Sequence, residues 1–211
     1  MKILITNIYL ASFSGTEVYV RDLAIALHKK GMDVEVFTNL LGLVSNEIEE
    51  AGIHVVDSVD QLIHQPDIIH AHHFIPTMEV IRRFPDIPII YFLHDRTHLV
   101  DSPPKYHRIV KYIAVDYNCL DRLLIDHRIE KEKTDVLFNW VDTKRFKIRS
   151  EINEKPLKAV VFSNYASSDS HFKNIQEACA TMGIELDGIG LKLGKSVKNP
   201  ENFLQNYDIN Q

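Results

Sequence analysis

The sequence predicts an α/β protein with a doubly wound, Rossmann-like parallel sheet, followed by the start of a second Rossmann-like sheet. Short apolar runs rich in β-branched residues alternate with amphipathic helical segments along most of the 211 residues. The connections between these segments are short. Repeated strand and helix with short connections indicates parallel strands joined by right-handed crossovers.

Residues 1–39 contain the first strand, helix and second strand of this sheet. Strands are expected at residues 3–6 and 34–37, and Ser14 and Glu17 between them have the spacing of a capping box at a helix start. Gly31, which follows two lysines, supplies the left-handed stop of that helix. Free N–H groups at the helix start favour an anion such as a phosphate, although Ser14 and Glu17 could equally do no more than cap the helix.

The remaining elements continue the alternation. Further strands are expected at residues 54–56, 67–70, 89–93, 112–115 and 134–138, and helical segments at residues 44–51, 59–64, 77–84 and 116–126. After the charge-rich residues 147–155, strands at residues 159–162 and 185–189 flank a helix at residues 170–182. We therefore expect domains at residues 1–150 and 156–211, the second being too small for a core of its own.

Composition excludes several function classes. The net charge of -5 argues against nucleic acid as a partner, because binding a phosphate backbone needs a basic face. Cys119 and Cys179 are too few for a disulfide framework, which favours a reducing compartment. The chain opens on a strand where a signal peptide would carry its apolar core, and it has no run of 18 apolar residues. We expect a cytoplasmic protein.

Two common phosphate-binding motifs are absent from the first turn. Gly15 stands alone where the dinucleotide fingerprint needs three glycines, and the second strand ends in Thr38-Asn39 without the acid that would hold a ribose. The Walker A loop is also missing. We therefore expect no nicotinamide cofactor, and a less specific phosphate or sugar site at residues 14–17.

Several segments together resemble a known enzyme family. In chain order they are LITNIY with the following SGTE, DIIHAH at residues 67–72, FLHD at 92–95, IAV at 113–115 and NWVDTKRF at 139–146. They resemble family-four glycosyltransferases of the GT-B fold, whose N-G-V-D-x-x-x-F is similar to the last segment, with Trp140 in place of Gly. The resemblance covers residues 1–165. It implies two Rossmann-like domains facing across a cleft, the first for a hydroxyl acceptor and the second for a nucleotide sugar.

The resemblance also implies a reaction and a set of donor contacts. Transfer would usually retain the anomeric configuration and need no metal or other cofactor. His94 corresponds to the active-site histidine that hydrogen-bonds the donor sugar. Gly15 and Thr16 would offer backbone N–H groups to the donor's β-phosphate, where negative charge grows as the nucleotide leaves.

The second half departs from the family at the donor site. Where the family places an Arg and a Lys after the strand at 159–162, this chain has SNYA at 163–166. Asn164 and Lys173 are therefore our candidates for binding the donor. The family also carries two glutamates late in its second domain, so the resemblance implies that this chain ends before its donor site is complete and is inactive alone.

The expected acceptor site lies near a cluster of histidines. His70, His72 and His73 could hold a metal, face an acceptor, or pack at the end of a strand, and no carboxylate accompanies them at a recognised metal-site spacing. We predict His72, His73 and Arg96 as acceptor-binding residues, and no metal site. Asp95 and Arg96 could also orient His94, or form a solvated pair.

The acceptor is expected to be a glycan of the cell envelope or a lipid-linked glycan. A basic set is compatible with lipid headgroups at the inner membrane face or with an ordinary solvated surface; it comprises Lys131, Lys133, Lys144, Arg145, Lys147 and Arg149. Two other functions stay open, namely a nucleotide-sugar epimerase using carboxylates near His94, and a non-catalytic carbohydrate- or partner-binding module.

Overall fold

The computed structural model of the chain describes residues 1–147, 155–163, 166 and 171–190. The chain divides into two compact units, Met1–Asn139 and Trp140–Gln211. Asn164 and Arg149 lie outside the described residues. No helix in the described ranges is both long and apolar enough to cross a membrane.

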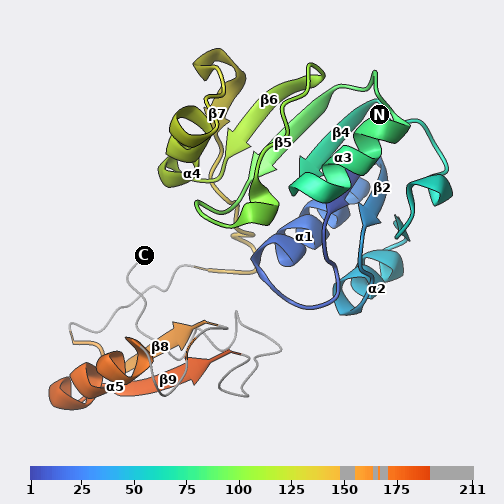
Figure 1. The fold of residues 1–211 in the computed structure, drawn as a ribbon. Coiled ribbons are helices and arrows are strands. Elements are labelled where there is room, and N and C mark those ends of the chain that lie inside the picture. The colour runs from blue at the N-terminus through green and yellow to red at the C-terminus, as the bar shows by residue number, and fades with distance from the viewer. Residues whose placement is uncertain (148–154, 164–165, 167–170, 191–211) are drawn as a thin grey trace. The chain divides into compact units, whose positions relative to one another are not determined.

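The first unit is built on a seven-stranded sheet in which every pairing is parallel (Figure 1). The strand order is β3-β2-β1-β4-β5-β6-β7. The strands are β1 (Lys2–Asn7), β2 (Asp33–Thr38), β3 (His54–Val56), β4 (Ile68–His72), β5 (Ile89–Leu93), β6 (Ile109–Ala114) and β7 (Thr134–Val136). The predicted doubly wound parallel sheet is confirmed.

Helices cover both faces of this sheet. They are α1 (Gly15–Lys29), α2 (Leu43–Glu50), α3 (Phe74–Arg83) and α4 (Tyr117–Asp121), with a π-helical turn η3 (Arg122–Asp126) and 3-10 turns η1 (Val59–Gln61), η2 (Leu99–Asp101) and η4 (Lys131–Lys133). One core lies under α1 and α2 and includes Ile5 and Val20. The other lies under α3 and α4 and includes Tyr91 and Val80. These two cores account for the near-continuous apolar runs of the central strands.

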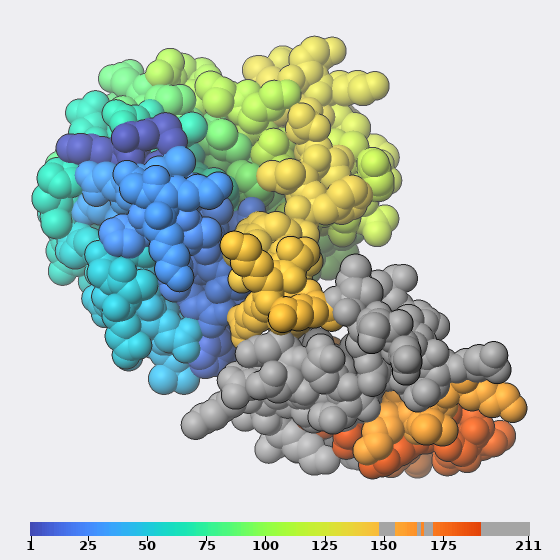
Figure 2. All heavy atoms as spheres, turned by 180° about the vertical axis from the view of Figure 1, so that it is seen from behind, coloured from blue at the N-terminus to red at the C-terminus, as the bar shows by residue number. Residues whose placement is uncertain are grey.

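The strand order reverses between β1 and β4. From β1 the chain proceeds outward through β2 and β3, and it then returns to β4 and proceeds the other way through β5, β6 and β7. Figure 2 shows the resulting separation from behind, with blue and cyan residues on one flank of the first unit and green residues on the other. Open α/β sheets bind ligands at such a point, beyond the carboxyl ends of the strands.

The structure shifts the boundaries of some predicted elements. β4 continues to His72, two residues beyond the predicted strand, and α3 begins at Phe74, three residues earlier than predicted. The reason is His73, which has a φ of 62° and turns the chain from strand to helix in one residue. The Thr77 hydroxyl donates to the His73 carbonyl oxygen at 2.6 Å and holds this turn.

The predicted capping box at the start of α1 is wrong. Ser14 is the N-cap residue, but its side chain accepts no backbone N–H. The Ser14 hydroxyl donates instead to the Glu17 carboxylate, which also accepts the Thr16 hydroxyl at 3.0 Å. The helix end at Gly31 is as predicted, with a φ of 80°.

The loops that follow β1 and β2 are joined by backbone hydrogen bonds. Leu10 N–H donates to the Leu40 carbonyl at 2.9 Å, and Leu43 N–H donates to the Ala11 carbonyl at 3.0 Å. Gly42 lies so close to Ala11 that a Cβ at residue 42 would be 2.6 Å from the Ala11 Cα. These contacts attach the loop that leads into α1 to the loop after β2. They fix the residue at which α1 begins.

The second unit contains two parallel strands, β8 (Lys158–Phe162) and β9 (Glu185–Ile189), and the helix α5 (His171–Met182) (Figure 1). Their order and type agree with the predicted strand, helix and strand. Before them, the predicted turn around NWVDTKRF is present. The Asp142 carboxylate accepts Lys144 N–H at 2.9 Å, and the Asp142 carbonyl accepts Phe146 N–H at 2.8 Å.

We predict that Gly42→Ala lowers the free energy of unfolding by about 1–3 kcal/mol, because the added Cβ would meet backbone atoms of Ala11 that cannot rotate away. Gly15→Ala is the matched control, since a Cβ at residue 15 meets nothing within 4 Å. Urea unfolding of both variants tests this. Equal stability of the two variants would show that the loops do not depend on this contact.

Candidate active site

The carboxyl ends of β4 and β5 bring two predicted site residues into direct contact. His72 Nδ1 lies 2.8 Å from His94 Nε2, a hydrogen-bond distance. His72 ends β4, and His94 follows β5 directly. Because β4 and β5 pair in parallel, with His72 opposite Phe92, the two imidazoles come from adjacent strands at the same edge of the sheet.

His72 is anchored on its other side by β1. The Thr6 hydroxyl accepts His72 N–H at 3.0 Å and donates to the His72 carbonyl at 3.1 Å. These two bonds extend the contact between β1 and β4 beyond their regular pairing, which ends at Ile5 and His70. Both Thr6 and His72 are fully buried.

A tyrosine of α1 joins the histidines to the start of that helix. The ring centroid of Tyr19 lies 4.9 Å from that of His94 and 5.5 Å from that of His72, both in edge-to-face geometry. Tyr19 is four residues after Gly15, so it lies on the same side of α1. The structure thus places the His94 imidazole on the same face of the sheet as the helix that Gly15 begins.

The backbone N–H groups at the start of α1 are available in the described part of the chain. The first helical bond runs from Val18 N–H to the Ser14 carbonyl at 3.0 Å. Gly15 and Thr16 N–H donate to no acceptor among the described residues. The Thr16 hydroxyl is already bound to Glu17. What Gly15 and Thr16 can offer a ligand is therefore their backbone, and their role toward a donor phosphate stays a prediction.

The histidines are held in a neutral state. Burial, with His73 and His70 nearby, lowers the pKa of His94 to about 3. Burial alone lowers the pKa of His70 to about 4, and the His70 ring stacks on Phe92 with centroids 4.1 Å apart. Burial and the other histidines also lower the pKa of His72 well below its ordinary value. At neutral pH these rings act as hydrogen-bonding groups without charge.

His73 is oriented away from this cluster. Its Nδ1 accepts Ile8 N–H at 3.3 Å, and its Nε2 lies 3.6 Å from Asp101 Oδ1. The side chain is buried, and burial lowers its pKa to about 4. Burial raises the pKa of Asp101 to about 7, with Asp95 as a further cause. In the described structure His73 ties the loops after β1 and β5 together, and its role toward an acceptor stays a prediction.

The residues after His94 form their own network. The Asp95 carboxylate accepts Thr97 N–H at 2.6 Å and His98 N–H at 2.7 Å, and the Thr97 N–H is the main reason why its pKa is lowered. Buried Arg122 donates to the Asp95 carbonyl at 2.7 Å. Arg96 forms an exposed ion pair with Asp126. Asp95 therefore shapes the loop, and contact between Arg96 and an acceptor stays a prediction.

The role of Lys173 in donor binding and the role of the basic set at a membrane stay predictions. Lys173 is exposed on α5. The basic set is divided between the two units, and within it Lys133 pairs with Glu130 at 3.0 Å, while the Arg145 guanidinium lies 5.1 Å from the centre of the Phe146 ring.

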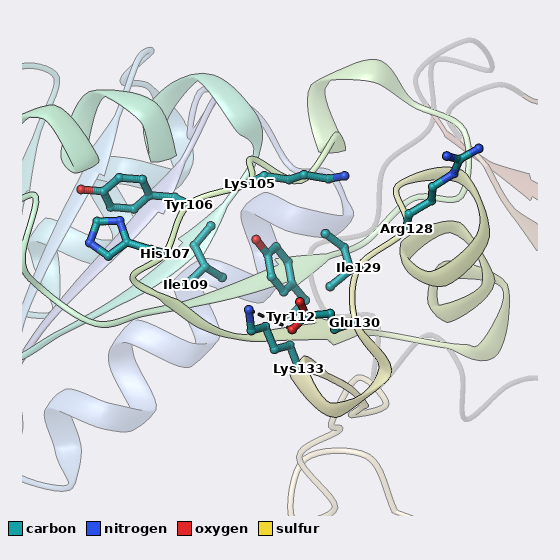
Figure 3. Close-up of a pocket in the computed structure, with 9 residues that line it drawn as sticks. All are labelled: Lys105, Tyr106, His107, Ile109, Tyr112, Arg128, Ile129, Glu130 and Lys133. Carbon is teal, nitrogen blue, oxygen red and sulfur yellow. Dashed lines mark ion pairs between the residues drawn. The ribbon is translucent and has the colours of Figure 1, made fainter.

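A separate pocket of about 400 Å³ lies at the opposite, amino end of β6 and β7 (Figure 3). Ile109, Tyr112 and Ile129 form its buried floor, and the ion pair between Lys133 and Glu130 stands at its edge. Tyr112 donates its hydroxyl to the Pro104 carbonyl at 2.8 Å, so it has a partner already. In Figure 3 Arg128 points away from this floor. None of the predicted catalytic, donor-binding or acceptor-binding residues lines this pocket.

Among the described residues, no three side chains of His, Cys, Asp or Glu are placed to hold a metal ion. His70 and His72 do share one face, with ring centroids 4.8 Å apart. The described cluster is completed by the aromatic rings of Tyr19 and Phe92, which contact the His72 ring.

The sequence profile described as Glycosyltransferase Family 4 matches residues 13–145, which is more than half of the chain. The chain belongs to glycosyltransferase family 4. The matched range contains α1 and both histidine-bearing strand ends. No curated protein sequence matched the family 4 chain significantly.

Solved structures share the fold of the family 4 chain. A glycosyltransferase from Rickettsia africae is 14% identical, with a TM-score of 0.65, over 97% of this chain and 63% of that one. Anabaena HepE in complex with UDP-glucose is 16% identical, with a TM-score of 0.62, over 97% of this chain and 65% of that one. A second HepE structure contains UDP and glucose. The family 4 chain thus spans less than two thirds of the length of these structures.

Sequence reasoning missed Tyr19, Thr6 and Asp101. The signals that indicate the first helix, Ser14, Glu17 and Gly31, do not include Tyr19, although its spacing of four residues from Gly15 could have placed it on the same helix face. Thr6 was counted only as the end of a strand. Its contact with His72 spans 66 residues of sequence, so no local signal could have revealed it.

The buried histidines predict a loss of stability in acid. Because the folded state lowers the pKa of His70 to about 4, the unfolded state binds more protons between that pH and about 6.5, and stability falls as the pH falls through this window. Relative to His70→Phe, which can still stack on Phe92, the wild type should lose up to about 1.4 kcal/mol per pH unit there. Urea unfolding between pH 4 and 8 measures the difference, and parallel pH profiles would contradict it.

Proposed function

We propose that this chain provides the acceptor-side half of a glycosyltransferase that moves a sugar from a nucleotide-sugar donor to a hydroxyl of a glycan or lipid-linked acceptor. The observation that carries the proposal is the contact of His94 with both His72 and Tyr19, which puts an uncharged imidazole beside the helix that begins at Gly15. Family membership supports a glycosyltransferase. The two HepE complexes, one with UDP-glucose and one with UDP and glucose, support a nucleotide sugar as the donor.

The proposed reaction needs this half of the protein to stabilise the leaving group and to bind the donor sugar. As the bond between the sugar C1 and the phosphate oxygen breaks, its electron pair and negative charge pass to the leaving nucleoside diphosphate. Backbone N–H groups of Gly15 and Thr16, at the positive end of α1, would stabilise that charge. The acceptor oxygen forms the new bond to C1 and passes its proton to a phosphate oxygen of the leaving nucleoside diphosphate. Retention of the anomeric configuration, the usual course in this family, belongs to the proposal.

His94 would bind the sugar as a neutral group. With a pKa of about 3, the His94 ring carries no charge at neutral pH. It can therefore form a hydrogen bond with a sugar hydroxyl as a neutral group. The epimerase alternative is less well supported, because no carboxylate among the described residues is hydrogen-bonded to His94. Asp95 is engaged by its own loop, and Asp101 faces His73.

The proposal predicts where a donor changes the spectrum of the labelled protein. Adding UDP-glucose, with other nucleotide sugars in parallel, should shift the backbone amide resonances of Gly15 and Thr16 and the ring resonances of His94 in two-dimensional NMR. The amide of Gly52, which follows the C-terminal end of α2, serves as an internal control. Shifts confined to other regions, or no shifts at millimolar donor, would contradict the proposal.

Shifts caused equally by free glucose and by UDP-glucose would favour the non-catalytic carbohydrate-binding alternative. A glycosyltransferase site should instead respond to the nucleotide diphosphate group, because the N–H groups of α1 recognise phosphate. Release of UDP in the presence of a hydroxyl acceptor then tests the transfer itself, and turnover would contradict the expectation that the chain is inactive alone.

A further inference from the structure

The hydrogen bond between His72 and His94 contains one proton, and its position decides what His94 can offer a ligand. The two ring nitrogens that meet, His72 Nδ1 and His94 Nε2, are 2.8 Å apart. In a pair of neutral imidazoles one nitrogen must donate and the other accept. Either His72 donates from Nδ1 or His94 donates from Nε2. The surroundings of His72 distinguish these two arrangements.

The other nitrogen of His72 is buried without a partner. Within the described residues, His72 Nε2 has no hydrogen-bond partner and is inaccessible to solvent. If His94 donated, His72 would carry its own proton on Nε2 as a buried N–H with no acceptor. If His72 donates from Nδ1, Nε2 is a bare acceptor. Buried donors without partners are rarer in proteins than buried acceptors without partners, so the second arrangement is favoured.

We propose that His72 is a positioning residue that fixes His94 in the tautomer with its proton on Nδ1, so that His94 presents an N–H donor to an oxygen of the donor sugar. In this arrangement His94 Nε2 accepts from His72, and the single proton of the neutral ring sits on Nδ1. Among the described residues, Nδ1 of His94 has no hydrogen-bond partner. The His94 side chain is partly exposed, in contrast to His72.

The surrounding contacts make His72 suitable for this task. Its backbone is held on both sides by the Thr6 hydroxyl. Its ring contacts Tyr19 at 5.5 Å and Phe92 at 5.6 Å between centroids, so it is packed from α1 and from β5. A ring held by main chain and by packing at once has little freedom to flip. It can therefore impose one hydrogen-bond direction on its neighbour, as outer-shell groups do for metal-binding histidines.

The inference rests on the proposed function only for the identity of the ligand. The tautomer itself is a property of the free protein. Two-bond ¹H–¹⁵N correlation spectra of ¹⁵N-histidine-labelled protein at neutral pH, without any ligand, show which ring nitrogen is protonated, and substitution of single histidines assigns the signals. We expect His94 and His72 both to be protonated on Nδ1. A proton on His94 Nε2, or rapid exchange between the two tautomers, would overturn the proposal.

Three variants separate positioning from packing. His72→Asn places an amide N–H near the position of Nδ1 and should keep His94 protonated on Nδ1. His72→Leu removes the donor and should release His94 to mixed tautomers. His70→Phe is the matched control, since His70 lies on the same face of β4 but has no hydrogen bond to His94, and it should leave the His94 signals unchanged. If Asn and Leu at residue 72 give the same His94 tautomer, His72 does not position it.

The same variants give a functional readout that a packing role would not produce. In donor titrations, His72→Leu should weaken binding of UDP-glucose at least tenfold and leave binding of UDP within twofold, whereas His72→Asn should restore most of the difference. Equal losses for UDP and UDP-glucose would overturn the role of His72 toward the sugar. No donor binding by the wild type, with His94 protonated on Nδ1, would count against the proposed function and not against the tautomer.

Discussion

The double hydrogen bond between Thr6 and His72 is the constraint on which the site depends. It joins β1 to β4 beyond their regular pairing, at the point where the strand order reverses. Through β1 it connects to the loop that leads into α1, and through His72 it connects to His94 on the next strand. The junction adds a side-chain constraint to the regular pairing of β1, β4 and β5.

The histidine side chains around this junction are buried or partly buried, and their imidazole rings are uncharged. Burial holds the pKa values of His70, His73 and His94 at about 4, 4 and 3, so that all three rings are neutral across the physiological range. Neutral imidazoles can pair with one another and with aromatic rings, whereas charged ones would repel. In the proposed function, such a site would recognise uncharged hydroxyl groups through the direction of its hydrogen bonds, and backbone N–H groups would recognise the negative charge.

Most of the fold could be predicted from the sequence because it is encoded locally. The apolar runs around Ile5, Val36 and Tyr91 are strands in the structure, and Gly31 ends its helix in the predicted left-handed conformation. The errors have a common cause, which is competition from contacts that local patterns do not contain. Ser14 and Glu17 bond to each other and not to the helix backbone, and His73 begins α3 by adopting a positive φ.

The sequence by itself determined the α/β class and the order of the elements, because apolar periodicity and short motifs lie within a few neighbouring residues, and its resemblance to the family selected His94 as a candidate. Only the tertiary structure decided that His72 contacts His94, that Tyr19 covers both rings and that His73 is directed toward Asp101. These contacts join strands and helices that are distant in the chain. Their geometry depends on sheet register and packing, which arise only when the whole sheet has formed.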